Sequence, residues 1–163
     1  METVTKEAIF KILEVVSDPE IPVLSVVDMG VIRDINLDNN QIEVIITPTY
    51  SGCPAMNVIE IEILATLKMN GFENVKVKTV LSPAWTTDWL TERGRQRLLE
   101  YGIAPPAKGT VDKNALFPED RVVACPQCQS ENTKMISQFG STACKSMYKC
   151  KDCLEPFDYF KCI

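Results

Sequence analysis

Two pairs of cysteines near the end of the chain constrain its fold more than any other feature. The pairs are Cys125-Pro-Gln-Cys128 and Cys150-Lys-Asp-Cys153, and 21 residues separate them. Two residues between thiols let each pair bind one cation from a tight turn, and two such turns complete the tetrahedron that zinc prefers, with Zn–S distances of about 2.3 Å. We therefore expect these four cysteines to bind a structural zinc ion.

Three other interpretations of these cysteines stay open: a rubredoxin-like iron site, an iron–sulfur cluster and disulfide bonds. Each of them leaves Cys144 and Cys162 as alternative ligands. Of the seven cysteines in the 163 residues, six lie in the last 39. An odd number of cysteines in a chain without a secretion signal favours metal binding over a disulfide framework. Because four thiolates leave no open position for catalysis, we interpret the metal as structural.

The composition excludes several classes of function. The chain has no histidine, which removes Ser-His and Cys-His nucleophile pairs and histidine metal ligands. Its formal net charge is −5, and residues 119–163 carry six acidic and six basic side chains. Binding of nucleic acid needs clustered Lys and Arg, so we expect no nucleic-acid partner. The polar N-terminus and the lack of a long apolar run predict a cytoplasmic protein without a membrane partner.

Hydrophobic periodicity predicts a mixed fold for the first hundred residues. The order of predicted elements is α-β-β-α-β-α, which indicates an α+β fold, a small two-layer α/β sandwich with a C-terminal zinc ribbon. A turn signal at 38–40 joins the first two strands into a hairpin. The predicted elements are a helix over 5–16, strands over 31–37 and 42–47, a helix over 54–69, a strand over 72–81 and a helix over about 91–101.

Composition also predicts the domain limits. Residues 105–118 are rich in Pro, Gly and Lys and lack periodicity, so we interpret them as a linker between a domain over 1–104 and a zinc ribbon over 119–163. Residues 133–147 can supply the hairpin of the ribbon. About 45 residues bury too little apolar surface to fold alone, and metal binding contributes on the order of 10 kcal/mol to such a module.

The seventh cysteine, Cys53, stands alone between a predicted strand and a predicted helix. Pro54 is well suited to a first helical turn, which places the thiol at the positive end of the helix dipole. That position predicts a lowered thiol pKa and a thiolate that binds soft metals or attacks electrophiles. Thr47, Thr49 and Ser51 add hydroxyl groups to the same loop. The competing interpretation is a buried, inert cysteine.

Carboxylates at Asp18, Glu20 and Asp28 lie near the ends of other predicted elements. Taken alone, such residues are more often part of turns and helix ends than metal ligands. The residues themselves therefore leave the ligand role of all three open.

Several motifs resemble known families. Asp18-Pro-Glu-Ile-Pro22, residues 27–32 and residues 47–54 resemble the small domain of SufT-like iron–sulfur assembly factors, and this similarity extends over about residues 5–82. Residues 81–90, with two tryptophans, and the cysteine-containing tail are similar to the PaaD family of the bacterial phenylacetate pathway over nearly the whole chain.

The resemblance implies an accessory or maturation factor for the multicomponent oxygenase that epoxidises the ring of phenylacetyl-CoA. The implied role is assistance with an iron–sulfur cluster or iron, through Cys53, and the family is not thought to catalyse the oxygenation itself. Asp18, Glu20, Asp28 and Thr47 match motif positions around that cysteine. The implied partners are the oxygenase and reductase components and the iron–sulfur assembly machinery.

Four hypotheses follow from these features. The first is a non-enzymatic assembly factor in which Cys53 holds iron or a labile cluster; one thiolate cannot satisfy a cluster, so a homodimer, a small thiol or the client must supply further ligands. The second is a structural or regulatory subunit of the oxygenase, with Cys53 incidental. The third is a thiol enzyme with Cys53 as nucleophile, and the fourth and poorest is a zinc-ribbon nucleic-acid binder.

Overall fold

The computed structural model describes residues 4–38, 41–106 and 121–161. The chain divides into two compact units, Met1–Trp85 with Trp89–Gly94, and Thr86–Asp88 with Arg95–Ile163. Residues 107–118 of the predicted linker lie outside the described residues, and the predicted domain limits stay predictions.

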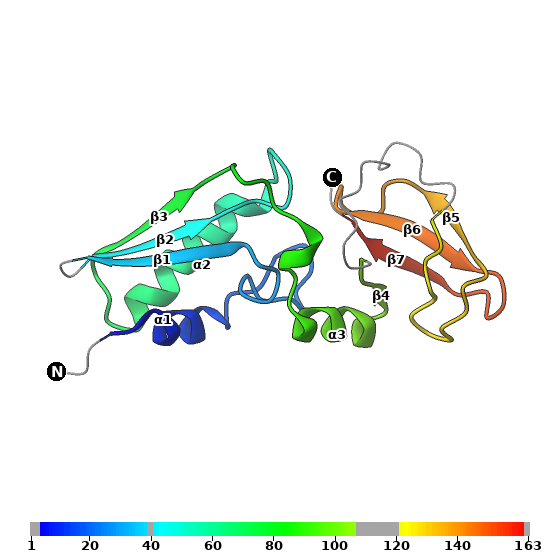
Figure 1. Cartoon of the computed structure of the whole chain (residues 1–163), viewed down its shortest axis with the longest axis horizontal. Helices are drawn as coiled ribbons and strands as arrows, with labels where there is room; N and C mark the ends of the chain where they lie inside the picture. Colours follow the sequence, from blue (N-terminus) through cyan, green and yellow to red (C-terminus); the bar gives the residue numbers. More distant parts are fainter. Residues whose placement is uncertain (1–3, 39–40, 107–120, 162–163) are drawn as a thin grey trace. The chain divides into compact units, whose positions relative to one another are not determined.

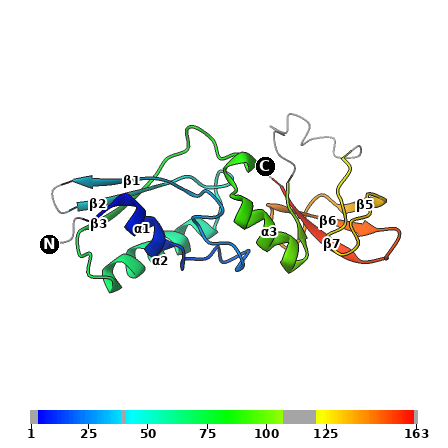
Figure 2. The ribbon, with the colours of Figure 1, turned by 60° about the horizontal axis from the view of Figure 1, so that its bottom comes forward.

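The first unit is a three-stranded sheet with two helices, α1 and α2, on the same side (Figures 1 and 2). The sheet order is β1-β2-β3, in which β1 and β2 are antiparallel and β2 and β3 are parallel. The parallel pair requires a crossover connection, which α2 provides. The predicted α+β class and the order α-β-β-α-β-α are confirmed. The bounds are α1 Lys6–Leu13, β1 Ile32–Asp38, β2 Gln41–Ile46, α2 Ala55–Met69 and β3 Val75–Thr79. Helix α3, Glu92–Tyr101, begins in the first unit and continues into the second.

The core of this unit lies between the sheet and the helices. Strand β2 alternates buried with half-buried or exposed side chains, as expected when one face of a sheet packs on helices. Helix α2 turns a matching apolar stripe toward the core at intervals of four residues. The loop between β2 and α2, residues 47–54, is therefore anchored at both ends by buried elements. The core side chains of these two elements are Ile42, Val44, Ile46, Ile59, Ile63 and Leu67.

Both tryptophans of the 81–90 segment belong to this unit. The Trp85 indole is buried and donates a hydrogen bond to the Met29 carbonyl at 2.9 Å, so Trp85 belongs to the core of this unit. The Trp89 indole is half-buried, and the Arg33 guanidinium stacks over it at 3.3 Å from the ring centre. Gly30 has φ +72°, and a Cβ atom there would lie 2.4 Å from the Trp89 carbonyl oxygen, so this close approach requires glycine.

The second unit contains a four-stranded sheet of order β4-β7-β6-β5, in which β4 is green and the other strands run from yellow-orange to red in Figure 1. β4 and β7 are parallel, whereas β5–β6 and β6–β7 are antiparallel. The β5–β6 hairpin was expected from the sequence, but β4 and β7 were not. Tyr148 packs on Phe157 and Tyr159 in the small core of this sheet, which also contains Cys125 and Cys150. The bounds are β4 Ile103–Ala104, β5 Thr133–Ser137, β6 Lys145–Cys150 and β7 Pro156–Phe160.

Within the described ranges, no helix has the length and apolar character needed to cross a membrane.

Candidate metal centres

Two similar turns carry the four C-terminal cysteines. Cys125 and Cys128 lie in a turn before β5, whereas Cys150 is the last residue of β6 and Cys153 lies in the turn between β6 and β7. The backbone N–H of Cys125 donates to the Ser130 carbonyl at 2.9 Å, and that of Cys150 donates to the Glu155 carbonyl, also at 2.9 Å. In each turn the residue after the second cysteine has a left-handed backbone conformation: φ is 61° at Gln129 and 67° at Leu154.

The four sulfur atoms form one cluster, which we call the four-cysteine cluster (Cys125, Cys128, Cys150 and Cys153). All four lie within 4.8 Å of one another. The Cys125–Cys153 and Cys128–Cys150 sulfur pairs are 3.7 and 3.6 Å apart. A tetrahedral ion with metal–sulfur bonds of about 2.3 Å requires sulfur separations of about 3.8 Å, so the donor set fits a tetrathiolate metal site.

A polar contact joins the two turns next to the sulfur atoms. The Asp152 carboxylate accepts hydrogen bonds from the Ser130 hydroxyl and from the Asn132 amide, the latter at 2.7 Å. These two hydrogen bonds lower the pKa of Asp152, because they stabilise the charged form. The turns are thus held together by side chains that are not themselves sulfur ligands, as is common around metal sites.

Cys144 lies outside this cluster. Its side chain is buried, and its sulfur is 3.1 Å from the Thr142 hydroxyl oxygen. The other suggested alternative ligand, Cys162, lies outside the described residues.

Cys53 lies immediately before α2, as the sequence predicted. Pro54 is the N-cap residue of that helix, and Cys53 is 9% exposed. The sulfur accepts a hydrogen bond from the backbone N–H of Ala55 and interacts with the Tyr50 side chain. The thiol is therefore at a helix start but largely covered from solvent.

The predicted lowering of the Cys53 pKa is wrong. Burial raises the pKa of this thiol most, and the nearby charges of Glu20 and Asp18 raise it further, against the opposing hydrogen bonds from Ala55 and Tyr50. The thiol is thus neutral near pH 7 in the metal-free chain. Sequence reasoning considered the helix dipole but not the desolvation that comes with close packing.

The structure brings two of the predicted carboxylates into the surroundings of Cys53. Asp18 is buried, and its Oδ1 accepts hydrogen bonds from the backbone N–H groups of Glu20 and Ile21 at 2.7 and 2.9 Å. This turn fixes the backbone that carries Glu20. Both carboxylates act electrostatically on the Cys53 thiol, although 33 to 35 residues separate them in sequence.

The three predicted hydroxyl residues lie along the loop before Cys53 in different environments. Thr47 and Thr49 are buried, whereas Ser51 is exposed. The Thr47 hydroxyl oxygen has no hydrogen-bond partner among the described residues. A buried polar atom without a partner is rare and is commonly associated with a ligand or function. Tyr50, which contacts the sulfur, was not predicted as a site residue although it lies in the same loop.

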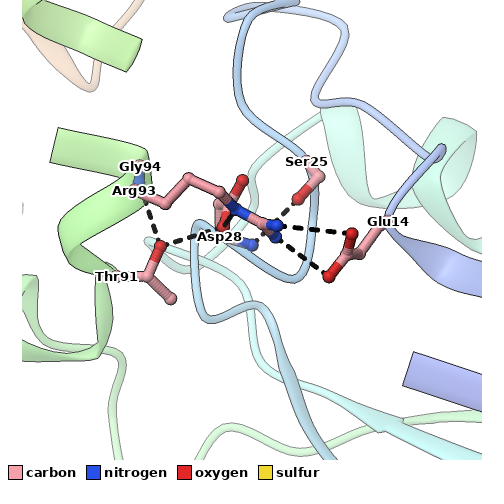
Figure 3. Close-up of polar contacts among 6 residues, drawn as sticks. All are labelled: Glu14, Ser25, Asp28, Thr91, Arg93 and Gly94. Atoms are coloured by element: carbon pink, nitrogen blue, oxygen red, sulfur yellow. Dashed lines mark hydrogen bonds and ion pairs between the residues drawn. The ribbon is translucent and has the colours of Figure 1, made fainter. Parts of the chain in front are cut away.

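Asp28, the third predicted carboxylate, has partners of a different kind (Figure 3). It is fully buried and accepts hydrogen bonds from the Arg93 Nε at 2.7 Å and the Thr91 hydroxyl at 2.9 Å. Arg93 also reaches Glu14, with the Nη2–Oε1 distance 3.1 Å. Asp28 thus joins the 25–30 turn to the start of α3, and its support of Cys53 stays a prediction. No sequence signal pointed to Arg93.

Comparison with known proteins places this geometry in a family. A family model described as "PaaD zinc beta ribbon domain" matches residues 109–161, and a model described as "Iron-sulfur cluster assembly protein" matches residues 6–79. An Escherichia coli K12 protein, named as a putative subunit of 1,2-phenylacetyl-CoA epoxidase, is 49% identical over 155 residues, covering 95% of this chain and 92% of that protein. The chain belongs to the PaaD family. Its Cys53 and its four-cysteine cluster each lie within one of the two matched regions.

Two further proteins match the first part of this PaaD-family chain. A Porphyromonas gingivalis protein named "Fe-S protein maturation auxiliary factor" is 33% identical over 101 residues, covering 61% of this chain and 92% of its own length. A Bacillus anthracis crystal structure, described as a domain of unknown function DUF59, covers 57% of this chain and 90% of its own, with a TM-score of 0.54 and 26% identity.

The structure predicts that removing metal from the four-cysteine cluster unfolds the ribbon strands but not α2. Chelation of the full-length chain should increase amide hydrogen exchange in β5, β6 and β7, because metal binding supplies much of the folding free energy of such modules. Exchange in α2 should stay slow, because its core does not involve the cluster. Cys128→Ser should behave like the chelated protein, whereas Cys144→Ser, the matched control, should retain metal. Equal protection of the ribbon with and without metal would contradict this prediction.

A second prediction concerns Asp28. Asp28→Ala leaves Arg93 and Thr91 without their buried acceptor and should lower the free energy of unfolding by roughly 2–4 kcal/mol. Glu14→Ala removes the exposed partner of the same arginine and should cost less than about 1 kcal/mol. Urea unfolding of both variants measures the difference. Equal effects of the two substitutions would show that the buried carboxylate does not organise this part of the unit.

Proposed function

We propose that this chain is a non-catalytic accessory factor in phenylacetate degradation that assists maturation of phenylacetyl-CoA epoxidase through Cys53. The observation that carries the proposal is the surroundings of Cys53, where one thiol, at a helix start, is influenced by the carboxylates of Asp18 and Glu20. This arrangement lies in the region that matches the iron–sulfur assembly family. The name of the E. coli relative refers to the epoxidase, and the name of the P. gingivalis relative refers to maturation of Fe-S proteins.

The electrostatics of this site favour a cation as cargo. The two carboxylates that disfavour a thiolate without a bound metal favour a positive ion close to the sulfur, since opposite charges attract. Arrival of iron would then displace the thiol proton to solvent, leaving the thiolate as a ligand. One thiolate with carboxylate neighbours fills fewer coordination positions of iron than four thiolates would. An incomplete ligand set is suited to passing the cargo to a client, and a cluster would need further ligands from a second copy, a small thiol or the client.

The raised pKa of Cys53 also separates this proposal from a thiol enzyme. A nucleophilic cysteine needs its thiolate at neutral pH, and burial beside two carboxylates works against that form. The chain has no histidine to act as a base for the sulfur.

We further propose that the four-cysteine cluster holds zinc as a structural ion. Its sulfur separations of 3.6 and 3.7 Å suit a tetrahedral site, and the matching family model describes a zinc ribbon. Zinc in such a site supplies folding free energy and no redox chemistry. Thiolates from the two turns would hold the ion, and the contact of Asp152 with Ser130 and Asn132 would keep the turns in place.

A second candidate function is a structural or regulatory subunit of the oxygenase, with Cys53 incidental. The name of the E. coli relative, which calls that protein a subunit, favours it. The two candidates differ in when the protein is needed. A maturation factor is needed only before the metal centres of its client are complete, whereas an oxygenase subunit must be present throughout turnover.

The proposal predicts a specific defect in the client proteins. When the epoxidase oxygenase and reductase components are co-expressed with Cys53→Ser, iron and acid-labile sulfide in one purified component should fall roughly tenfold. Cys144→Ser, which replaces another buried cysteine, should leave the loading normal. Iron and sulfide analysis of each component measures the effect, and circular dichroism checks that both variants are folded.

Normal loading of every component with Cys53→Ser would contradict the maturation role of this residue. Removal of the accessory protein after maturation distinguishes the maturation factor from the second candidate, a structural or regulatory subunit. Epoxidase activity that persists after removal supports the maturation factor, while activity that is lost and returns on adding back Cys53→Ser supports the structural or regulatory role.

A further inference from the structure

The outer face of the β5–β6 hairpin gathers three lysines. Lys134 on β5 and Lys149 on β6 are directly opposite each other in the antiparallel register. Lys151 is the first residue after β6, which ends at Cys150. All three side chains are exposed. Opposite residues of an antiparallel pair point to the same face, where like charges repel each other. The isolated chain thus carries an unfavourable charge pair on this face.

Nothing in the described part of the chain neutralises these lysines. None of the three makes an ion pair there within 4.0 Å. The other cross-strand neighbour of Lys149 is Pro156, which has no charge. Two acidic residues of the same strands and turns have other partners: Asp158 lies 4.0 Å from Lys145, and Asp152 accepts hydrogen bonds from the opposite turn. In a chain with net charge −5, this face therefore carries three exposed lysines that make no ion pair with the described residues.

Apolar side chains accompany the positive charge. Two hollows of about 520 and 780 Å³ share Lys134, Met135, Ile136 and Lys151 in their walls. Leu154 also lines the smaller hollow. Ile136 is 55% exposed and Leu154 is 64% exposed. We call the surface formed by Lys134, Lys149, Lys151, Ile136 and Leu154 the lysine–leucine face.

Leu154 shares the left-handed backbone conformation of Gln129, its counterpart in the other cysteine turn, but it carries an apolar side chain there. Its φ of 67° lies in the left-handed region, which glycine adopts without cost and which a bulky side chain adopts only with strain. Most of its side chain is exposed, so packing within the described unit does not compensate for this strain. The cysteine turn accounts for this backbone conformation, whereas an exposed leucine beside three lysines offers apolar surface to a partner.

The ordinary explanation for lysines on a sheet surface accounts for only part of this face. Charged residues on an edge strand prevent unwanted pairing with other chains, and β5 is an edge strand. However, Lys149 lies on β6, which has a strand on each side, and Lys151 lies in the turn that carries Cys153. Edge protection explains neither of these two lysines, nor the exposure of Leu154.

We propose that the lysine–leucine face binds an acidic segment of a partner protein, in which an apolar side chain lies among carboxylates. The carboxylates lie against the three lysines, and the apolar side chain packs on Ile136 and Leu154. Opposite charge would orient the encounter, and burial of the apolar pair would stabilise the complex. Nucleic acid suits this face less well, because three lysines neutralise few phosphates and no exposed aromatic side chain lies among the five residues. This inference does not depend on the role of Cys53.

The test uses the full-length, zinc-loaded chain labelled with ¹⁵N and a synthetic peptide of alternating Glu-Asp pairs and leucines. The peptide should shift the amide resonances of β5, β6 and the turn at Leu154, and its affinity should fall at higher salt. A peptide with Gln and Asn in place of Glu and Asp should bind at least tenfold more weakly. Lys134→Glu combined with Lys149→Glu should weaken binding of the acidic peptide at least tenfold. Lys68→Glu combined with Lys78→Glu, an equal change of charge on exposed lysines of the first unit, should not.

A second pair of variants, which should fold normally, shows whether a loss of binding comes from the face itself or from misfolding. Leu154→Gly and Gln129→Gly each place glycine at a left-handed position, so neither should lower the melting temperature. Leu154→Gly should weaken peptide binding severalfold, and Gln129→Gly should leave it unchanged. The proposal is overturned if the acidic peptide does not bind, if it binds all four variants like the parent chain, or if a single-stranded oligonucleotide binds this face more tightly than the peptide.

Discussion

The burial of α2 against the three-stranded sheet is the interaction on which the rest of the first unit depends. It buries Ile59, Ile63 and Leu67 and, together with the buried end of β2, fixes both ends of the short loop that carries Cys53. A loop anchored in this way holds its cysteine in one place, which a ligand site requires and an ordinary surface loop does not provide. The same packing covers the sulfur and removes it from solvent, which is the largest cause of the raised pKa of this thiol.

The two cysteine sites of this PaaD-family chain have opposite chemical character. The four-cysteine cluster brings four sulfur atoms within 4.8 Å of one another, which satisfies a tetrahedral ion and leaves no position for another ligand. Cys53 offers one sulfur, influenced by the carboxylates of Asp18 and Glu20, and therefore an incomplete ligand set. A complete site suits an ion that stays, and an incomplete one suits an ion or cluster that is passed on. The division of labour we propose follows from this difference.

Sequence patterns predicted the features of the fold and of the metal site that depend on local periodicity and residue spacing. The helices, the β1–β2 hairpin and the two cysteine pairs all follow from residues close together in the chain. The patterns missed β4, because two residues show no periodicity, and the contact of Arg93 with Asp28, because 65 residues separate them. They also gave the wrong direction for the Cys53 pKa, because a helix start is visible in sequence whereas desolvation and carboxylates brought near by folding are not. The left-handed conformation of Leu154 gave no signal either, since glycine is the usual residue there.

The most direct test of the central claim is metal binding at Cys53 itself. Anaerobic titration of the zinc-loaded chain with Co²⁺, a spectroscopic substitute for iron, should add one ion beyond the zinc. That ion should show sulfur-to-metal charge-transfer absorption and release a proton from the thiol, because the raised pKa of Cys53 keeps the thiol protonated until the metal binds. Both signals should be lost in Cys53→Ser. Unchanged absorption and proton release in that variant, or no binding beyond the zinc in the parent chain, would contradict the account.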